Sequence, residues 1–365
     1  MQPSAPSASA PSKGRLLLDL VRVTKTFEGF KAVDSVSFSV MENEFFTMVG
    51  PSGSGKTTLL RMIAGMDKPT DGDITLRGSS IVPLPPNKRP TCMVFQSLAL
   101  FPHKTVGQNI EFPLKMRGAP DYERKARALE LMAMVQLPED YYSKNVMKCS
   151  GGERQRVALA RAFAYDPEIL LFDEPLSAID YKLRKTLEKE LKELHARSGK
   201  TFIYITHSLE EAMVMSDRIG VMQRGHLIQV GTPEEIYARP KNRFVAEFMG
   251  DTNLLKVRAD GTGTWKLEGL PGRYKVSGNK EILDGYIVVR PEFVNFLSDE
   301  TGADNAVRGT ICNEFSLGSR VQYHVRVNKN LTIIAEQPRS ALRQADEKGE
   351  VVVGWNAADA IFVEE

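Results

Sequence analysis

The sequence predicts two domains, an α/β domain with a largely parallel sheet followed by a small all-β barrel or sandwich. Between about residues 15 and 231, apolar runs of strand length alternate with helical stretches, and this alternation is typical of a parallel sheet covered by helices. From residue 253 onward, short β-rich segments are separated by Gly, Asn and Asp, which favours a barrel or sandwich of roughly 110 residues. The length of 365 residues agrees, because a usual domain has about half that length.

The expected elements follow in order along the chain. Residues 1–14 are mostly Pro, Ser and Ala, so we expect a disordered tail. No secretory signal is expected, because the only apolar candidate nearby, 16–18, is too short. Apolar residues at helical spacing around Pro240 predict two short helices within 233–249 that join the domains. Strands are expected at 16–23, 45–49, 91–95, 169–172 and 202–206 in the first domain, and at 286–290, 321–327, 331–335 and 351–355 in the second.

The composition excludes several classes of protein. Hydrophobic residues make up 42% and charged residues 26%, as in ordinary globular proteins. No apolar stretch approaches the roughly 18 to 20 residues that cross a bilayer. The net charge of +2 gives no bulk attraction for nucleic acid, so no nucleic-acid partner is expected. Cys92, Cys149 and Cys312 are too far apart for a disulfide framework or a zinc site, which suits a reducing cytoplasm, and the five histidines are scattered.

A glycine-rich loop is the strongest signal. Residues 50–57 read Gly-Pro-Ser-Gly-Ser-Gly-Lys-Thr, after the expected strand 45–49 and before a helix expected at 58–64. The glycines let successive backbone N–H groups point at phosphate oxygens at the positive end of the helix dipole. Lys56 would reach the terminal phosphates of a nucleoside triphosphate, and Thr57 would give its hydroxyl to Mg²⁺. The alternative is a glycine-rich turn that only links the strand to the helix.

Two acidic residues follow a second buried strand. Asp173 and Glu174 come directly after the apolar run 169–172, and ligands of open α/β sheets bind at the carboxyl ends of such strands. Asp173 is therefore expected to hold the metal through its water shell. Glu174 is expected to polarise the water that attacks the terminal phosphate. The alternative is a solvated turn, which the phosphate loop makes less favoured.

Two weaker signals complete the set. Ser150, Gly151 and Gly152 precede the helical run 157–165; Ser150 is a good helix N-cap, and the glycines expose N–H groups to an anion. Alone, this pattern also fits a plain helix start. His207 follows the expected strand 202–206 directly, where a lone histidine is more often structural than catalytic.

In this order, however, the motifs resemble those of the nucleotide-binding subunits of ATP-binding cassette (ABC) transporters. The resemblance covers essentially the whole chain after the tail and implies an ABC-type phosphate-loop NTPase with a mixed sheet, from 15 to 250, and a helical subdomain at about 97–165. It also implies binding of ATP and Mg²⁺. The residues implied to contact the nucleotide within the phosphate loop and the helix after it are Gly50, Ser52, Gly53, Ser54, Gly55, Lys56, Thr57 and Thr58.

The resemblance assigns roles to residues outside the loop as well. Phe27 resembles the aromatic residue that stacks on adenine, with a core Phe as the alternative. Gln96 resembles the glutamine that senses Mg²⁺ and the attacking water, and His207 the switch histidine at the terminal phosphate. Asp180, at the end of the coupling loop (residues 177–180), resembles the aspartate that couples two subunits. In the family, the Ser-Gly-Gly motif at 150–152 contacts ATP bound to the other subunit, which implies a dimer with composite sites.

The second domain narrows the resemblance. Arg290-Pro291-Glu292, 308–311 and 316–318 resemble the accessory β domain at the C-terminus of importer ATPases, implied here at 251–365. The stretch 95–103 also resembles that group. Polyamine import is the leading interpretation, by overall resemblance. The implied partners are a second copy of the chain, two transmembrane permease subunits and, indirectly, a periplasmic or extracellular solute-binding protein. The implied location is peripheral, at the cytoplasmic face of the membrane.

Three residues depart from the family pattern. The motif around Ser150 begins with Cys149 where Leu is usual and continues with Glu153 where Gln is common, and Ile179 replaces Leu in the coupling loop. These changes leave the Ser-Gly-Gly core and Asp180 in place. Cys149 lies near a helix N-terminus, so it is either a thiol with a lowered pKa or, as we favour, a small buried hydrophobic residue.

The expected function is ATP hydrolysis that powers solute import. Importers for iron(III), phosphonate or sugar remain alternatives to polyamines. A soluble ABC-type ATPase acting on nucleic acid or ribosomes is a second class, disfavoured because only 53 residues separate Gln96 from Cys149, which leaves no room for a long coiled coil, and because the chain has one nucleotide module. A regulatory module that does not hydrolyse ATP is a third class, and it is disfavoured because Glu174 and His207 are both present.

Overall fold

The computed structural model describes residues 14–364 except for 178, 260–263, 271, 277–283 and 342–348. The expected tail therefore lies almost entirely outside the described residues. The chain divides into two compact units, Met1–Pro233 and Glu234–Glu365. None of the helices within the described ranges has both the length and the apolar composition that a membrane span requires.

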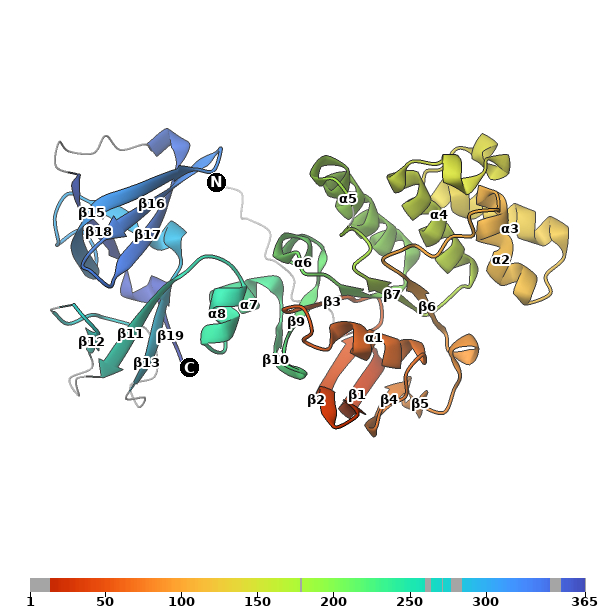
Figure 1. Ribbon diagram of the computed structural model, residues 1–365, viewed down its shortest axis with the longest axis horizontal. Helices are drawn as coiled ribbons and strands as arrows, with labels where there is room; N and C mark the ends of the chain where they lie inside the picture. The colour runs from red at the N-terminus through yellow and green to blue at the C-terminus, as the bar shows by residue number, and fades with distance from the viewer. Residues whose placement is uncertain are drawn as a thin grey trace, which may run out of the picture. The chain divides into compact units, whose positions relative to one another are not determined.

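The first unit is built around a six-stranded sheet in the order β10-β9-β3-β8-β7-β6 (Figure 1). The neighbours from β9 to β6 are parallel, and β10 joins the edge antiparallel to β9. The side chains of β3 and β8 are buried on both faces, as parallel strands covered by helices require. The bounds are β3 Phe45–Val49, β6 Thr91–Val94, β7 Ile169–Asp173, β8 Thr201–Ile205, β9 Arg218–Gln223 and β10 His226–Gly231.

A second, antiparallel sheet in the order β2-β1-β4-β5 packs beside it. The helix α1 (Lys56–Ala64) shares one apolar core with both sheets. The strands are β1 Leu16–Phe27, β2 Phe30–Met41, β4 Asp71–Leu76 and β5 Ser79–Ser80. The prediction of an α/β domain with a mixed sheet is confirmed, and this core places the start of α1 at the carboxyl edge of β3.

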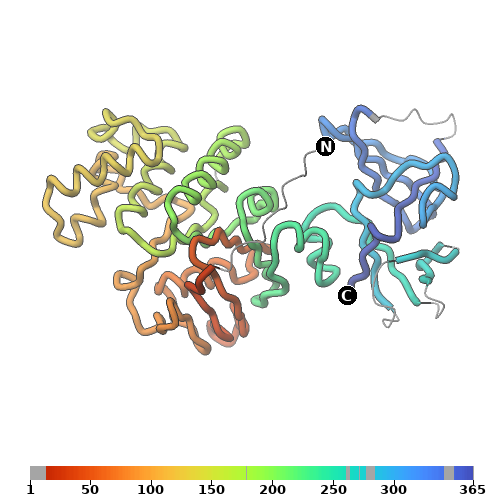
Figure 2. The backbone as a smooth tube through the Cα atoms, turned by 180° about the vertical axis from the view of Figure 1, so that it is seen from behind, coloured from red at the N-terminus to blue at the C-terminus, as the bar shows by residue number. Residues whose placement is uncertain are grey.

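The remaining helices of this unit share a second core on the sheet. Figure 2 shows α2, α3 and α4, in yellow to yellow-green, gathered at one end of the unit. These three helices fall within the stretch predicted as a helical subdomain. The bounds are α2 Val106–Met116, α3 Asp121–Met134, α4 Gly151–Ala164, α5 Tyr181–Ser198 and α6 Leu209–Met215, with short 3-10 turns at Pro86–Lys88, Glu139–Ser143 and Val146–Lys148.

The second unit confirms the all-β prediction. Two antiparallel sheets, β12-β11-β13-β19 and β14-β18-β15-β16-β17, enclose a shared apolar core. Their strands are β11 Asn253–Ala259, β12 Trp265–Leu267, β13 Asp284–Val289, β14 Asn295–Leu297, β15 Asn305–Ser316, β16 Arg320–Arg326, β17 Thr332–Pro338, β18 Glu350–Trp355 and β19 Ala360–Val363. Short 3-10 turns lie at Pro291–Phe293, Arg339–Ala341 and Ala357–Asp359.

Two helices, α7 (Pro233–Ala238) and α8 (Arg243–Phe248), precede these strands. A buried arginine, Arg290, connects them to the β domain: the residue is 1% exposed, and its guanidinium lies 4.2 Å above the ring of Tyr237. The Tyr237 hydroxyl in turn donates to Glu292 at 2.6 Å. The carbonyls that accept from Arg290 are those of Tyr237, Ala246, Gly250 and Asp251, at 2.9 to 3.3 Å. The Arg-Pro-Glu motif therefore fixes both helices to the strands that follow them.

Candidate functional site

The phosphate loop connects β3 to α1 and needs glycine where the backbone is left-handed. Gly55, just before the helix, has φ of 100°. A Cβ placed there would lie 2.4 Å from the carbonyl oxygen of Ala32 on β2, far inside van der Waals contact. Only glycine combines this conformation with this close approach, so the loop takes the tight path that lets its N–H groups face one point.

Lys56 folds back over that loop. Its side chain is 6% exposed, and Nζ donates to the carbonyls of Gly50 and Pro51 at 2.7 and 3.0 Å and to Oγ of Ser54 at 3.4 Å. Burial lowers the pKa of Lys56, while the nearby carboxylates of Glu174 and Asp173 oppose that shift. The ammonium group is thus held at the mouth of the loop, where a phosphate would meet it.

Thr57 and Asp173 bring two oxygen ligands together beside Lys56. Oγ1 of Thr57 donates to Oδ1 of Asp173 at 3.0 Å. Burial raises the pKa of Asp173, and the neighbouring Glu174 adds to that shift. A divalent cation would offset this unfavourable charge, and hydroxyl and carboxylate oxygens are the hard ligands that Mg²⁺ prefers. The residues present therefore fit the expected metal.

Glu174 and His207 face each other at the same sheet edge. The backbone of Glu174 is left-handed, with φ of 47°, and its N–H donates to the carbonyl of Ile205 at the end of β8. This conformation is unusual for a non-glycine residue and typical of functional sites. Oε2 of Glu174 lies 3.1 Å from Nδ1 of His207, whose side chain is 60% exposed. The candidate base and the candidate switch are therefore in contact, with the histidine open to a ligand.

Gln96 joins this group through a serine of the coupling loop. Its Nε2 donates to Oγ of Ser177 at 3.0 Å, and that hydroxyl donates to the carbonyl of Glu174 at 2.9 Å. Asp180 at the other end of the loop is the N-cap of α5 and accepts from the N–H of Leu183 at 3.1 Å. The structure thus brings together six predicted site residues: Lys56, Thr57, Gln96, Asp173, Glu174 and His207.

Ser150 begins α4 in a reciprocal capping arrangement. Its hydroxyl accepts from the N–H of Glu153 at 3.3 Å, and Oε2 of Glu153 accepts from the N–H of Ser150 at 2.8 Å. The second bond lowers the pKa of Glu153. Glutamine can make the same bond, so Glu153 is a mild departure from the family pattern.

Two alternatives from the sequence are resolved by burial. Cys149 belongs to the core under the helices, and burial raises the pKa of its thiol, so it is a small core residue rather than an activated thiol. Phe27 ends β1 with 45% of its surface exposed, under the ammonium of Lys25 at 4.8 Å. The ring is therefore not a core side chain, and its stacking on adenine stays a prediction.

Sequence reasoning missed the buried hydrogen bonds that fix the chain next to His207. Glu211 on α6 is 3% exposed and accepts from the hydroxyls of Tyr204 and Thr206, both at 2.8 Å. A signal was present, because Ser208 and Glu211 have the spacing of a capping box. Ser208 does cap the helix, but the carboxylate turns to the strand instead of to the N–H of Ser208.

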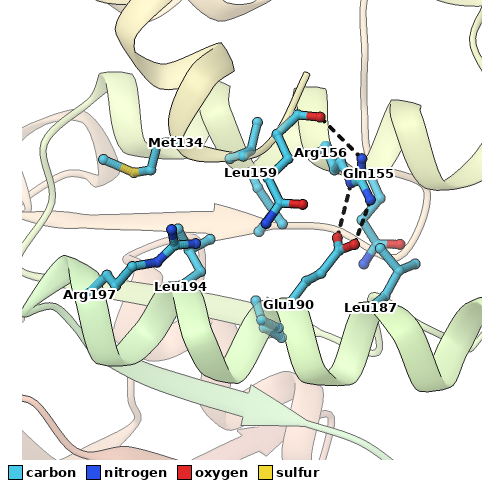
Figure 3. Close-up of a pocket in the computed structure, with 11 residues that line it drawn as sticks. Met134, Gln155, Arg156, Leu159, Leu187, Glu190, Leu194 and Arg197 are labelled. Atoms are coloured by element: carbon cyan, nitrogen blue, oxygen red, sulfur yellow. Dashed lines mark hydrogen bonds and ion pairs between the residues drawn. The ribbon is translucent and has the colours of Figure 1, made fainter. Parts of the chain in front are cut away.

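A small cavity between α4 and α5 is not a nucleotide site (Figure 3). Its volume is about 20 Å³, enough for about one water molecule. Arg156 of α4 bridges it with two bonds to Glu190 of α5, at 3.0 and 2.5 Å, and donates to the carbonyl of Gln136. The cavity marks a junction where the two helices are tied together.

A phosphate loop at the end of a parallel strand, with an acidic pair at the end of β7 and a histidine just after β8, defines a phosphate-loop NTPase. Residues 33–177 match the ABC transporter family, and residues 287–363 match the TOBE domain. The spermidine/putrescine import ATP-binding protein PotA of Mesorhizobium japonicum is 45% identical over 363 residues, 95% of this chain and 98% of that one. The protein of the same name from Thermotoga maritima is 41% identical over the same shares.

Solved structures agree. A dimeric ATP-binding cassette bound to ADP and Pi in a post-hydrolysis state is 34% identical, with a TM-score of 0.53 over 60% of this chain and 99% of that one. The chain belongs to the family of ABC-transporter ATP-binding subunits. It is an ATP-binding and ATP-hydrolysing protein, and membership implies that it works as a dimer with membrane permease subunits.

Proposed function

We propose that this chain hydrolyses ATP to power an importer of polyamines of the spermidine and putrescine type. One observation supports ATP hydrolysis: five predicted site residues converge at one sheet edge around the buried ammonium of Lys56. Thr57 contacts Asp173 at 3.0 Å, and Glu174 contacts His207 at 3.1 Å. The solute rests on the import function named for the relatives in Mesorhizobium japonicum and Thermotoga maritima.

Each residue has a chemical task in this proposal. The N–H groups of residues 50–55 and the ammonium of Lys56 bind the phosphates and offset their charge. Thr57 and Asp173 would hold Mg²⁺, directly and through water, with Gln96 beside them; the ion, when bound, neutralises charge that develops on the phosphate oxygens. Glu174 accepts the proton of the attacking water. His207 orients Glu174 and donates toward the terminal phosphate.

The nucleotide's other contacts come from two directions. Phe27 stacks on the adenine ring. The phosphates are contacted by the loop residues Gly50, Ser52, Gly53, Ser54 and Gly55 and by Thr58 of α1. A second copy of the chain supplies Ser150, Gly151 and Gly152 to close the site, and Asp180 of each copy couples the two sites. ATP shifts the dimer toward the closed state by its higher affinity for that state.

The permease contact is proposed at a groove beside the site. A cavity of about 380 Å³ lies between the segment after Gln96, the start of α4 and the coupling loop, with Leu98, Leu100 and Met147 in its lining. Apolar side chains there suit a helix of a permease subunit at the cytoplasmic face of the membrane. By the family resemblance, the nucleotide-binding domain is proposed to span 15–250 and the accessory domain 251–365, whereas the two compact units of the fold divide after Pro233. The solute-binding protein acts through the permeases, and no nucleic acid is required.

The decisive experiment reconstitutes the complete transporter. The chain is purified with its two permease subunits, placed in lipid vesicles, and assayed for phosphate release with solute-binding protein and spermidine or putrescine. We expect stimulation by polyamine and none from the variant Lys56→Ala, which also loses ATP binding by calorimetry. Stimulation by iron(III), phosphonate or sugar instead would move the chain to another importer, and stimulation by DNA or ribosomes would refute transport.

A further inference from the structure

The coupling loop is connected to α5 by one arginine. Nη2 of Arg184, one turn into α5, donates to the carbonyl of Ile179 in the loop at 2.8 Å. Its Nε is buried without a hydrogen-bond partner and lies 4.0 Å from Oε1 of Glu211 on α6. The guanidinium therefore spans the gap between the coupling loop and the helix that follows His207.

The other oxygen of Glu211 controls the chain on both sides of His207. Oε2 accepts from Oγ1 of Thr206, the residue before the histidine. The same Oγ1 accepts from the N–H of Ser208, the residue after it, at 2.9 Å. A displacement of the Glu211 carboxylate would therefore move both neighbours of His207. The side chain of His207 itself stays free to meet Glu174 and a ligand.

The charge balance favours Arg184 as the cation that acts on Glu211. The adjacent Lys185 is already engaged by two other carboxylates, Glu188 at 2.9 Å and Glu210 at 2.7 Å. Glu211 is almost fully buried, and a buried carboxylate needs a nearby positive charge. Because Nε of Arg184 has no hydrogen bond here, a small shift of the guanidinium toward Glu211 would gain one.

We infer that Arg184 and Glu211 are positioning residues that make the placement of His207 depend on the coupling loop. When the loop moves, Arg184 exchanges its bond to Ile179 for a closer one to Glu211, and the carboxylate carries Thr206 and Ser208 with it. The helix α5 also contacts the start of α4, where Leu183 lies beside Gly152 and Glu190 binds Arg156 (Figure 3). The Ser-Gly-Gly motif is thus mechanically linked to the same pair. This inference rests on the proposed function of His207 and Glu174.

The test measures ATP hydrolysis and nucleotide binding of the full chain. Arg184→Met should lower kcat about tenfold, the scale expected for a coupled neighbour of a catalytic group, with ATP affinity changed less than about twofold. Arg197→Met is the matched control, because Arg197 is an exposed arginine on the same helix, and it should leave kcat unchanged. Arg184→Lys should recover part of the loss because it restores the charge.

A double-mutant cycle separates positioning from stability. If Arg184 acts through His207, then Arg184→Met should lower kcat little further in a His207→Ala background. A full additional loss in that background, an effect on ATP affinity alone, or wild-type kcat in Arg184→Met would each overturn the inference. Glu211→Gln, checked for folding by its thermal midpoint, repeats the cycle from the other side. Absence of ATP hydrolysis by the wild-type chain would overturn the proposed function itself, and the inference with it.

Discussion

Gly55 offers a sharp test of the phosphate loop. The variant Gly55→Ala must hold a left-handed backbone, which costs an L-residue about 1 to 2 kcal/mol. Its Cβ would also lie 2.4 Å from the carbonyl oxygen of Ala32, against the 3.0 Å below which such contacts do not occur. The loop must therefore move by several tenths of an ångström. A misplacement of about 1 Å costs about 10²-fold in rate, so kcat/KM for ATP should fall by up to about 10²-fold, or about 2.7 kcal/mol.

The control for Gly55→Ala is Gly78→Ala. Gly78 is also left-handed, with φ of 80°, but a Cβ there meets nothing within 4 Å. Both variants should lose free energy of unfolding in urea from the left-handed backbone, and Gly55→Ala should lose more because of its added clash. Only Gly55→Ala should lose ATP hydrolysis, measured as phosphate release against ATP concentration. Equal activity of the two variants would show that the path of this loop does not set the binding of phosphate.

Three other predictions concern residues elsewhere in the chain. Glu174→Gln keeps an oxygen near His207 but removes the base, so turnover should fall about 10²-fold or more while calorimetry shows intact ATP binding; near-normal hydrolysis would exclude Glu174 as the base. Arg290→Met leaves buried carbonyls without a donor and should lower the free energy of unfolding of the second unit by about 3 kcal/mol, and an unchanged urea midpoint would contradict this. Burial raises the pKa of Cys92 to about 11 and raises that of Cys149, so at pH 7 both should react slowly with iodoacetamide until the protein unfolds; rapid labelling of Cys149 in the folded chain, seen by mass spectrometry, would be evidence for an activated thiol.

The sequence predicted the phosphate loop and the strand before it because their requirements are local. Glycines at fixed spacing and a short apolar run determine the turn, and the run 169–172 places Asp173 at a sheet edge in the same way. The antiparallel sheet was largely missed. The strand β1 contains register shifts near Val23, and Arg22 has φ of 49°, so the alternation that marks a strand is interrupted.

The contacts behind the site could not be read from the sequence for a different reason. Arg184 and Glu211 each lie on a charged, helical stretch, and such a stretch is usually a solvated face. Only the packing of α5 against α6 buries Glu211 and brings Arg184 beside it. Ser177 is similar, because its bond to Gln96 joins two segments that lie far apart in the sequence. Pairings of this kind depend on tertiary structure rather than on local pattern.

The bonds of Arg290 determine where the accessory domain can be exchanged between related ATPases. Because α7 and α8 are fixed to the β domain by one buried guanidinium, both helices belong structurally to the second unit. An exchange of accessory domains between related ATPases would preserve this unit if the junction lay just before α7, near Pro233. A junction at residue 250 would separate the helices from Arg290. The arginine would then have to donate to the carbonyls of helices from a different protein.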